Sequence, residues 1–402
     1  MSVRQYRLTV GSDSCEIRGF TNAHIQAAVD RVAMLGGGEV ELSAGVFQMV
    51  DSLHMRSHVS VKGQGSDTVL KKNAMKSARI TAFLGYGHND LELDTPDLFS
   101  AGEGIIIRDN NAFGFYTTVA TLVRREGDTW YTNCPHHHDY LGTNGGVVET
   151  LFPVISAVDI EDAEIEGLCV EGNSRENPIQ VNGCRAGGFL ALRSNRLKLR
   201  GIVVRDYNGD GIGFQTCDDM CVSDCVVEHC TGTGYHPGSG SNRFHIRGCT
   251  GRKNGGCGLF YCLRVRLGLL EDCVFVDNAL HGISIGERDT GSVNRGLTIR
   301  GNGGAGVYLR NCAAANAAHN SVIESCLIEH NCRGSSEGEA EIMLQGETDG
   351  VRVIGNTIRR NTGVPALLVR KEMRSFEWQD NRIEPSGADA VRDLRDCAVS
   401  EP

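Results

Sequence analysis

The chain has 402 residues, a formal net charge of −10 at pH 7, 51 glycines and 6% aromatic residues. The acidic balance argues against nucleic acid as a partner, since a nucleic-acid-binding surface needs clustered basic side chains. No run reaches the roughly 18 apolar residues of a membrane span, so no membrane is expected, and the glycine content favours a turn-rich β protein.

The N-terminal part of the chain predicts one helix. Residues 21–35 form an amphipathic pattern with Ile25, Val29 and Val32 on one face, and the glycines at 36–38 end it. Such a helix would cover the open end of a β domain and an otherwise exposed strand edge. No apolar signal segment precedes it at residues 1–5, which predicts either a cytoplasmic protein or a secreted one whose signal was removed.

Strand signals follow the helix and then change character. Short β-branched runs separated by glycine predict strands at 39–42, 46–47 and 58–62. Residues 85–150 break this pattern and predict an antiparallel β excursion, expected to form one wall of a groove. Its strands are expected at 104–108, 117–123 and 129–131.

From residue 208 to 310 the sequence aligns with itself at a period of 24 residues. Two repeat positions make the period visible: one holds Cys230, Asn254, Asn278 and Asn302, and the other holds Cys225, Cys249, Cys273 and Leu297. A fixed period of this length without helical periodicity predicts stacked coils of short strands. The asparagines should form a hydrogen-bonded ladder that continues at Asn331 and Asn361, and the cysteines, with Cys326, predict stacked free thiols rather than disulfides.

The predicted fold is therefore all-β, a single-stranded right-handed parallel β-helix with about 24 residues per turn, an N-terminal capping helix and a β excursion. One β-helix domain is expected over residues 1–384, with its most regular turns at 187–310 and the excursion inserted at 85–150. Residues 385–402 are expected to be a polar C-terminal tail.

A family resemblance supports this interpretation. The segments 27–30, 36–42, 45–47 and 59–65, followed by the repeats, resemble the cap and first turns of the pectate-lyase-like superfamily. The resemblance covers most of the chain. It implies a right-handed parallel β-helix, and it is only loosely informative about chemistry.

Alternation along each predicted strand indicates which side chains face the solvent. Two inward columns are expected: Ile212, Tyr235, Leu259, Ile283 and Val307 in one, and Phe214, Ile285 and Leu309 in the other. The outward positions combine acids, His, Tyr and Arg over adjacent turns, whereas an ordinary solvated face carries mainly Lys, Thr and Ser. This strip is the predicted active site, and scattered surface polar residues are the alternative.

The candidate residues fall into two groups. The candidate catalytic residues are Asp210, His236, His281, Glu287 and Asp289. The candidate substrate-binding residues are Gln215, Ser239, Tyr261, Ser284, Arg288, Tyr308 and Arg310. The structural alternatives are an ordinary turn at 236–241 and a simple ion pair within 287–289.

Two motifs resemble the polygalacturonase-type glycoside hydrolases: Asn-Gly-Asp-Gly-Ile at 208–212 and His-Gly-Ile-Ser-Ile-Gly at 281–286. The resemblance implies inverting hydrolysis, with Asp210 as a catalytic carboxyl and His281 in support. The spacing departs from that family, because His281 lies three turns beyond Asp210 and the pair Asp218 and Asp219 falls in the same turn as Asp210.

The favoured function is a carbohydrate-active enzyme that cleaves glycosidic bonds, a glycoside hydrolase in which Asp289, Glu287 or Asp219 is the second acid. The partner is then a carbohydrate substrate, and self-association is left open. One alternative is a non-catalytic glycan-binding solenoid. Exposed aromatic platforms favour such binders, but Trp130 and Trp378 lie outside the regular turns.

The other alternative is a polysaccharide lyase or uronate epimerase, with His236 or Tyr308 as the base and Arg288 or Arg310 beside the carboxylate. No cofactor and no metal is expected, and a Ca²⁺ ion would belong only to this alternative. The histidines at 136–138 and Asp139 offer ligand atoms, but adjacent residues on a strand face opposite sides, so a groove lining is expected instead.

Overall fold

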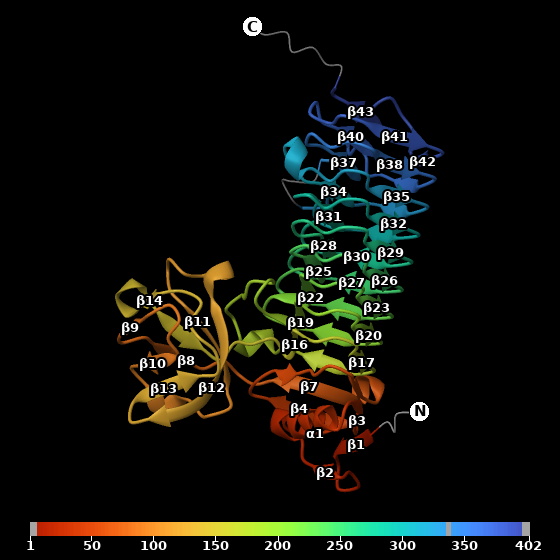
Figure 1. Ribbon diagram of the computed structural model, residues 1–402. Helices are drawn as coiled ribbons and strands as arrows, with labels where there is room; N and C mark the ends of the chain where they lie inside the picture. Colours follow the sequence, from red (N-terminus) through yellow and green to blue (C-terminus); the bar gives the residue numbers. More distant parts are fainter. Residues whose placement is uncertain (1–5, 335–338, 396–402) are drawn as a thin grey trace. The chain divides into compact units, whose positions relative to one another are not determined.

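The computed structural model describes residues 6–334 and 339–395 (Figure 1). The contacts within the chain divide it into two compact units. The first unit comprises residues 1–190 with 204–213, and the second comprises 191–203 with 214–402. Strands β19 (Gly187–Leu192), β21 (Val203–Arg205) and β22 (Asp210–Gln215) contain the boundaries between them. Among the described residues, no helix is both long and apolar enough to cross a membrane.

The first unit begins with the predicted cap. Helix α1 (Asn22–Met34) buries Ile25, Val29 and Val32, as expected, and it contacts strand β3 (Gly38–Leu42). The N–H of Gly37 bonds to the carbonyl of Val32 at 3.0 Å, and Gly37 adopts a φ of +106° that favours glycine. The glycine run therefore ends the helix as the sequence indicates.

Parallel strands follow the cap in three sheets, which we call A, B and C. In the first unit, sheet A contains β2 (Ile17–Arg18), β1 (Tyr6–Gly11), β3, β6 (Val59–Lys62) and β17 (Glu164–Glu166). Sheet B contains β4 (Gly45–Met49), β7 (Thr68–Lys72) and β18 (Cys169–Glu171), and sheet C contains β5 (Leu53–His54) and β16 (Ile155–Val158). The strands predicted at 39–42, 46–47 and 58–62 are confirmed.

The predicted excursion is an antiparallel sheet with its own apolar core. Its order is β10 (Asp90–Glu92), β13 (Thr129–Thr132), β12 (Thr118–Glu126), β11 (Gly104–Arg108), β15 (Val147–Glu149) and β8 (Ser77–Arg79). A two-stranded sheet joins β9 (Phe83–Leu84) and β14 (Tyr140–Leu141). The antiparallel strands are confirmed, but the excursion begins earlier than predicted, at β8. Its role as a groove wall stays a prediction.

The second unit is built from successive coils that each contribute one strand to every sheet. Sheet A holds β20 (Lys198–Arg200), β23 (Cys221–Ser223), β26 (His245–Arg247), β29 (Leu269–Glu271), β32 (Val293–Arg295), β35 (Val322–Glu324), β38 (Val351–Ile354) and β41 (Phe376–Gln379). Sheet B holds β24 (Val226–Glu228), β27 (Thr250–Arg252), β30 (Val274–Val276), β33 (Thr298–Arg300), β36 (Leu327–Glu329), β39 (Thr357–Arg359) and β42 (Arg382–Glu384). Sheet C holds β25 (Tyr235–Gly238), β28 (Leu259–Phe260), β31 (Ile283–Ile285), β34 (Val307–Leu309), β37 (Ile342–Leu344), β40 (Leu367–Val369) and β43 (Val391–Asp393).

The register of sheet C confirms the predicted inward columns. Tyr235 pairs with Leu259, Leu259 with Ile283, and Ile283 with Val307, and all four side chains are fully buried. The remaining inward residues, Ile212, Phe214, Ile285 and Leu309, are also fully buried. The all-β parallel β-helix predicted from the repeat is confirmed. Strand β43 pairs with β40, so the coils extend into the segment predicted as a tail, of which residues 396–402 lie outside the described part.

The asparagine ladder runs along the corner between sheets B and C. The amide nitrogen of each asparagine donates to the side-chain oxygen of the next one: Asn254 to Asn278 at 3.0 Å, Asn278 to Asn302 at 3.0 Å, and Asn302 to Asn331 at 2.8 Å. Each oxygen also accepts the main-chain N–H of the preceding asparagine, at 3.0 to 3.1 Å. The ladder therefore fixes both the corner and the stacking distance.

The ladder ends differently from the prediction. Asn331 donates its amide to the carboxyl of Glu341 at 2.7 Å, and Glu341 is fully buried. Asn361 instead donates to the main-chain oxygen of Asn331 at 3.2 Å. The expectation that Asn361 extends the ladder is wrong, because Glu341 reaches back into the corner and occupies the next acceptor position.

The cysteine column is a stack of free thiols, as predicted. Cys225, Cys249, Cys273 and Cys326 are free and buried at the corner between sheets A and B. The sulfur of Cys273 donates to the carbonyl of Glu271 at 3.2 Å, and that of Cys326 donates to the carbonyl of Glu324 at 3.3 Å. Burial raises the pKa of Cys326 to about 12, so this thiol stays protonated and behaves as a small apolar group.

The ladder predicts a stability cost for a single deletion. In Asn278→Ala, the amide and the main-chain N–H of Asn254 both lose their acceptor in a buried corner. We expect the free energy of unfolding to fall by about 3 kcal/mol, because each unmet buried donor costs about 1–3 kcal/mol. Urea denaturation followed by circular dichroism measures this loss. The control Asn311→Ala removes an exposed asparagine and should change stability little; equal losses in both variants would contradict the ladder's role.

Glu341 predicts a pH dependence of stability. Burial raises its pKa from 4.5 to about 7 in the folded protein, so the folded state binds a proton more tightly than the unfolded chain does. This contribution to stability is therefore complete below pH 4.5 and declines as the pH rises to about 7. The loss should be of order 3 kcal/mol.

The substitution Glu341→Gln keeps an amide oxygen as acceptor and removes the titration. We expect the free energy of unfolding of this variant to depend less on pH across that window than the wild type does. Denaturation series at several pH values provide the comparison. Glu377→Gln, at an exposed position of β41, should keep the wild-type profile; a wild-type profile in Glu341→Gln would refute the assignment.

Candidate active site

The outer face of sheet C in the second unit carries a continuous row of polar and aromatic side chains. His236, Phe260, Ser284 and Tyr308 occupy equivalent positions on β25, β28, β31 and β34, because Tyr235 pairs with Leu259, Phe260 with Ser284, and Ser284 with Tyr308. The next outward position along each strand holds Gly238, Cys262, Gly286 and Arg310. We call these eight residues the outer strip.

Arg310 is held in one position at the end of this strip. Its guanidinium donates to the Ser284 hydroxyl at 3.1 Å and to the Tyr261 carbonyl at 2.8 Å, and its central carbon lies 4.4 Å from the centre of the Phe260 ring. Its side chain is 15% exposed, and its Nε has no hydrogen-bond partner in the described structure. Since a Cβ on Gly286 would lie 2.7 Å from the Arg310 Cβ, only glycine at 286 leaves room for this arrangement.

Asp289 is the counterion of Arg310. One carboxylate oxygen lies 3.1 Å from the guanidinium and accepts the N–H of Gly286 at 3.0 Å, and the other accepts the N–H of Val265 at 2.9 Å. Burial raises the pKa of Asp289 to about 7, against the opposing effect of Arg310.

The Asp289 side chain is 0% exposed, so it positions Arg310 and cannot contact a substrate as the predicted catalytic acid would. Glu287 and Arg288 are exposed, in left-handed backbone conformations at the end of β31. The sequence pattern at 287–289 suggests an ion pair between adjacent residues, but Asp289 pairs with Arg310 of the next coil instead.

Tyr308 lies on a histidine. The rings of His281 and Tyr308 are stacked, with centres 4.0 Å apart and planes inclined by 5°. The Nδ1 of His281 accepts the N–H of Ala305 at 3.0 Å, so the ring proton of a neutral His281 is on Nε2. His281 is buried rather than outward-facing, and the stacking orients the half-exposed Tyr308.

At the other end of the strip, polar groups gather near Gly238. His236 is 6% exposed, and its ring meets that of Phe260 edge-on at a centre distance of 5.5 Å. Gln215 is 4% exposed, and neither its amide oxygen nor its amide nitrogen has a hydrogen-bond partner in the described structure. Ser239 follows at the strand end with a φ of +47°, and its carbonyl accepts the hydroxyl of Thr216 at 3.0 Å.

One predicted substrate contact is wrong. Tyr261 is fully buried, and its hydroxyl donates to the side-chain oxygen of Asn294 at 3.0 Å in the interior. The neighbouring Phe260 faces outward instead. The repeat alignment contains the signal for Phe260, since residue 260 falls in the column of Ser284 and Tyr308, whereas Tyr261 falls one position further along the strand and faces the interior.

The remaining sequence candidates lie elsewhere. Asp210 begins β22 in the first unit and is half-buried, so its pairing with any second acid stays a prediction. Asp219 is engaged by Arg243 at 2.8 Å on the surface of the second unit. His136 is buried within the excursion, where loss of solvation lowers its pKa, and its ring packs 6.2 Å from that of Tyr140.

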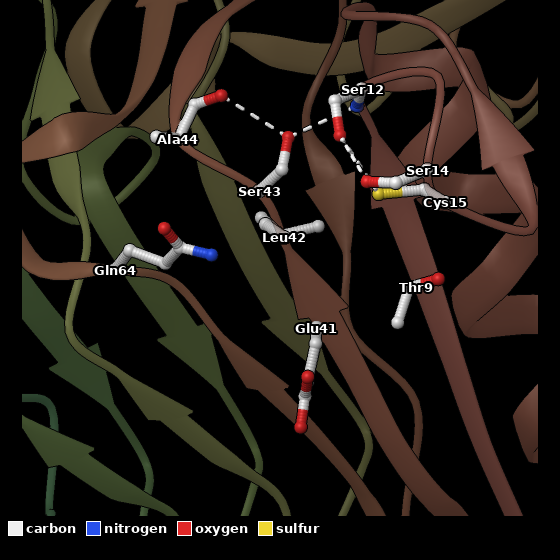
Figure 2. A pocket seen from close by; sticks show the side chains of 9 residues that line it. All are labelled: Thr9, Ser12, Ser14, Cys15, Glu41, Leu42, Ser43, Ala44 and Gln64. Atoms are coloured by element: carbon white, nitrogen blue, oxygen red, sulfur yellow. Dashed lines mark hydrogen bonds between the residues drawn. The ribbon is translucent and has the colours of Figure 1, made fainter.

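The first unit also contains two hollows that the sequence did not indicate. One, of about 400 Å³, is lined mainly by hydroxyl groups and by Cys15 (Figure 2). The hydroxyls of Ser12 and Ser14 lie 2.9 Å apart, and the Ser43 hydroxyl accepts the N–H of Ser12 at 3.1 Å. These groups largely satisfy one another. The hollow therefore offers hydrogen-bonding capacity but no arrangement of acid, base and cation like that of the outer strip.

The second hollow, of about 350 Å³, lies beside a buried lysine. Lys72 is fully buried, donates to the carbonyl of Thr150 at 3.1 Å and to the side chain of Asn177, and lies 4.8 Å from the ring of Phe152. Burial lowers its pKa to about 7. Since the ammonium bonds to the point where the excursion returns to the coils, this contact secures the base of the excursion.

Comparison with known proteins bears on the fold. A family model described as "Right handed beta helix region" matches residues 153–266 and 238–392, more than half of the chain, and supports the predicted handedness. No curated protein sequence matches the chain.

Several solved structures are similar at low identity. The A-module of mannuronan C-5 epimerase AlgE6 from Azotobacter vinelandii is 16% identical, with 92% of this chain and 94% of that one covered and a TM-score of 0.56. The AlgE4 A-module from the same organism is 15% identical, with 93% and 92% covered and a TM-score of 0.57. A protein described as a glycoside hydrolase is 10% identical, with 98% and 100% covered and a TM-score of 0.54. These likenesses show the fold alone.

Proposed function

The chain belongs to the right-handed β-helix family, and from that premise we propose that it is a carbohydrate-active enzyme whose outer strip binds an acidic glycan. In this proposal Arg310 pairs with the carboxylate of a uronic acid residue, and Tyr308 exchanges a proton with the sugar ring. The reaction is elimination or epimerisation at C5.

The fixed guanidinium of Arg310 carries the proposal. A planar guanidinium recognises a carboxylate through parallel hydrogen bonds, and here one edge is already held by Ser284 and Asp289. Its Nε is buried and has no hydrogen-bond partner among the described residues, and the side chain as a whole is 15% exposed. Stacking on Phe260 and the ion pair with Asp289 remove rotational freedom, so little entropy is lost when a carboxylate binds.

The chemistry at C5 follows from what lies beside Arg310. A cation at the carboxylate stabilises the negative charge that develops when the C5 proton is removed. Tyr308 is half-exposed and oriented by His281, which suits a group that takes or returns that proton. In elimination, the electrons of the C5–H bond form a C4–C5 double bond as the C4–O bond breaks and the leaving oxygen takes up a proton; in epimerisation, a proton that originates from solvent is added to C5 on the opposite face.

Hydrolysis, favoured by the sequence motifs, needs two carboxyl groups that face the substrate. In the second unit Asp289 is buried and Asp219 is held by Arg243, which leaves the exposed Glu287. The burial of Asp289 therefore favours proton transfer over hydrolysis. The mannuronan named for the AlgE6 and AlgE4 A-modules is a polymer of the acidic class proposed here.

A panel of uronic-acid oligosaccharides tests this proposal. We expect new ultraviolet absorbance from an unsaturated uronide, or uptake of deuterium from D₂O at C5 without cleavage. Products heavier by one water would show hydrolysis, and turnover of neutral glycans only would refute the acidic substrate. Mass spectrometry separates these outcomes.

Variants of the strip sharpen the test. Arg310→Lys keeps the charge but loses the planar fork, and Tyr308→Phe loses the proton-transfer group. Each should lower kcat/KM by a factor of about 100 to 10,000 while the unfolding midpoint of Tyr308→Phe stays near the wild type. Arg300→Ala, on the outer face of sheet B, is the matched control. Full activity of Arg310→Lys would contradict the proposed role of Arg310 in binding the carboxylate.

Asp210 gives a separate prediction. If it is a catalytic carboxyl, Asp210→Asn abolishes turnover and leaves the circular dichroism spectrum unchanged, while Asp13→Asn at an exposed position has no effect. Product analysis at low residual turnover then tells which reaction Asp210 serves. Full activity of Asp210→Asn would remove it from the mechanism.

A further inference from the structure

The absence of a side chain at Gly238 lets three potential metal ligands lie together in the second unit. A Cβ on Gly238 would lie 2.5 Å from the Gln215 amide oxygen, 3.0 Å from its nitrogen and 3.1 Å from the Cβ of Cys262. His236 precedes Gly238 by two residues on the same strand and faces the same side. Because Gly238 has no side chain, the Gln215 amide packs directly over it, next to the Cβ of Cys262 and on the side that His236 faces.

The imidazole and the thiol are close enough to share an ion. A ring nitrogen of His236 and the sulfur of Cys262 lie within 4.8 Å of one another. Around a tetrahedral zinc ion, with its usual bond lengths to sulfur and nitrogen, two such atoms are about 3.6 Å apart. A modest rotation of the half-buried Cys262 side chain closes this difference.

Gln215 provides an independent indication of a ligand. Its amide is nearly completely buried, carries no hydrogen bond in the described structure, and lies over Gly238. A buried amide without hydrogen bonds destabilises the folded protein by roughly 1–3 kcal/mol. A ligand that bonds to the Gln215 amide would offset this cost. Either the oxygen or the nitrogen of the amide can face His236 and Cys262, since a flip of the side chain exchanges the two atoms.

We propose that His236, Cys262 and Gln215 bind a zinc-type divalent transition-metal ion above Gly238. Thiolate and imidazole select such ions over Ca²⁺ and Mg²⁺, which prefer oxygen ligands. Three protein ligands leave one tetrahedral position for a further ligand, as in zinc sites that bind water or substrate. Binding releases the thiol proton to solvent, and the nearby Arg310 charge is balanced by Asp289.

Among the described residues, no other thiol of the second unit belongs to a group of potential metal ligands. Cys249 and Cys273 lie in the buried stack and donate to main-chain carbonyls at 3.4 and 3.2 Å. Cys312 is half-buried like Cys262 but belongs to none of the groups of potential ligands found among the described residues. Cys312 is therefore a matched control for a cysteine substitution.

Cobalt(II) titration of the full chain, prepared free of metal under reducing conditions, tests the site without any substrate. We expect one equivalent of Co²⁺ to bind and to produce thiolate-to-cobalt charge-transfer absorption in the near ultraviolet, which Zn²⁺ in equal amount removes. Cys262→Ser and His236→Ala should each weaken binding at least about 100-fold, more than the loss of an outer hydrogen-bond partner of a ligand. Cys312→Ser should bind like the wild type.

Gly238→Ala tests the site without removing a ligand, because its added methyl group would displace the flexible end of Gln215 and lie 3.1 Å from the Cβ of Cys262. This variant should stay folded by circular dichroism and lose cobalt binding. Charge-transfer absorption that persists in Cys262→Ser, or a wild type that binds no Co²⁺, would overturn the site. Since the readout involves no turnover, its failure would leave the proposed reaction of Arg310 and Tyr308 untouched.

Discussion

The structure depends on one repeated interaction, the hydrogen bond between an asparagine side chain and the same residue in the next coil. Each asparagine of the ladder satisfies a main-chain N–H and an amide at once, inside a corner that excludes water. Buried polar groups of this kind are favourable only when all are paired, so the ladder permits a single stacking register. The same register places inward residues on inward residues along sheet C.

This register also creates the candidate site. Because outward positions align from coil to coil, residues far apart in the sequence become neighbours: Phe260, Ser284 and Arg310 come from three successive coils and contact one another. Glycine at alternate coils then decides which long side chains can lie along the surface. Arg310 lies over Gly286, and Gln215 lies over Gly238. A β-helix thus builds a rigid site without a separate loop.

Several buried charged groups hold neighbouring side chains or segments in place at a cost in folding stability. Asp289 and Arg310 satisfy each other, but two charges removed from water rarely stabilise a fold more than apolar residues would. Lys72 and Glu341 are held with pKa values near 7, because their surroundings disfavour the ionised forms. Each secures an irregular element: Lys72 the base of the excursion, and Glu341 the end of the asparagine ladder.

The sequence by itself determined the repeat, the sheets, the cap and the inward columns, because a period of 24 residues in Cys225, Cys249 and Cys273 leaves little freedom in how short strands stack. It also placed Ser284, Tyr308 and Arg310 on one face. Only the tertiary structure shows which acidic side chain pairs with which basic or polar one. Asp289 bonds to Arg310 of the next coil rather than to Arg288, and Glu341 rather than Asn361 ends the ladder. The repeat period determines where each Cα lies along the stack of coils. The partners of long side chains depend in addition on contacts between coils and on the room that neighbouring glycines leave.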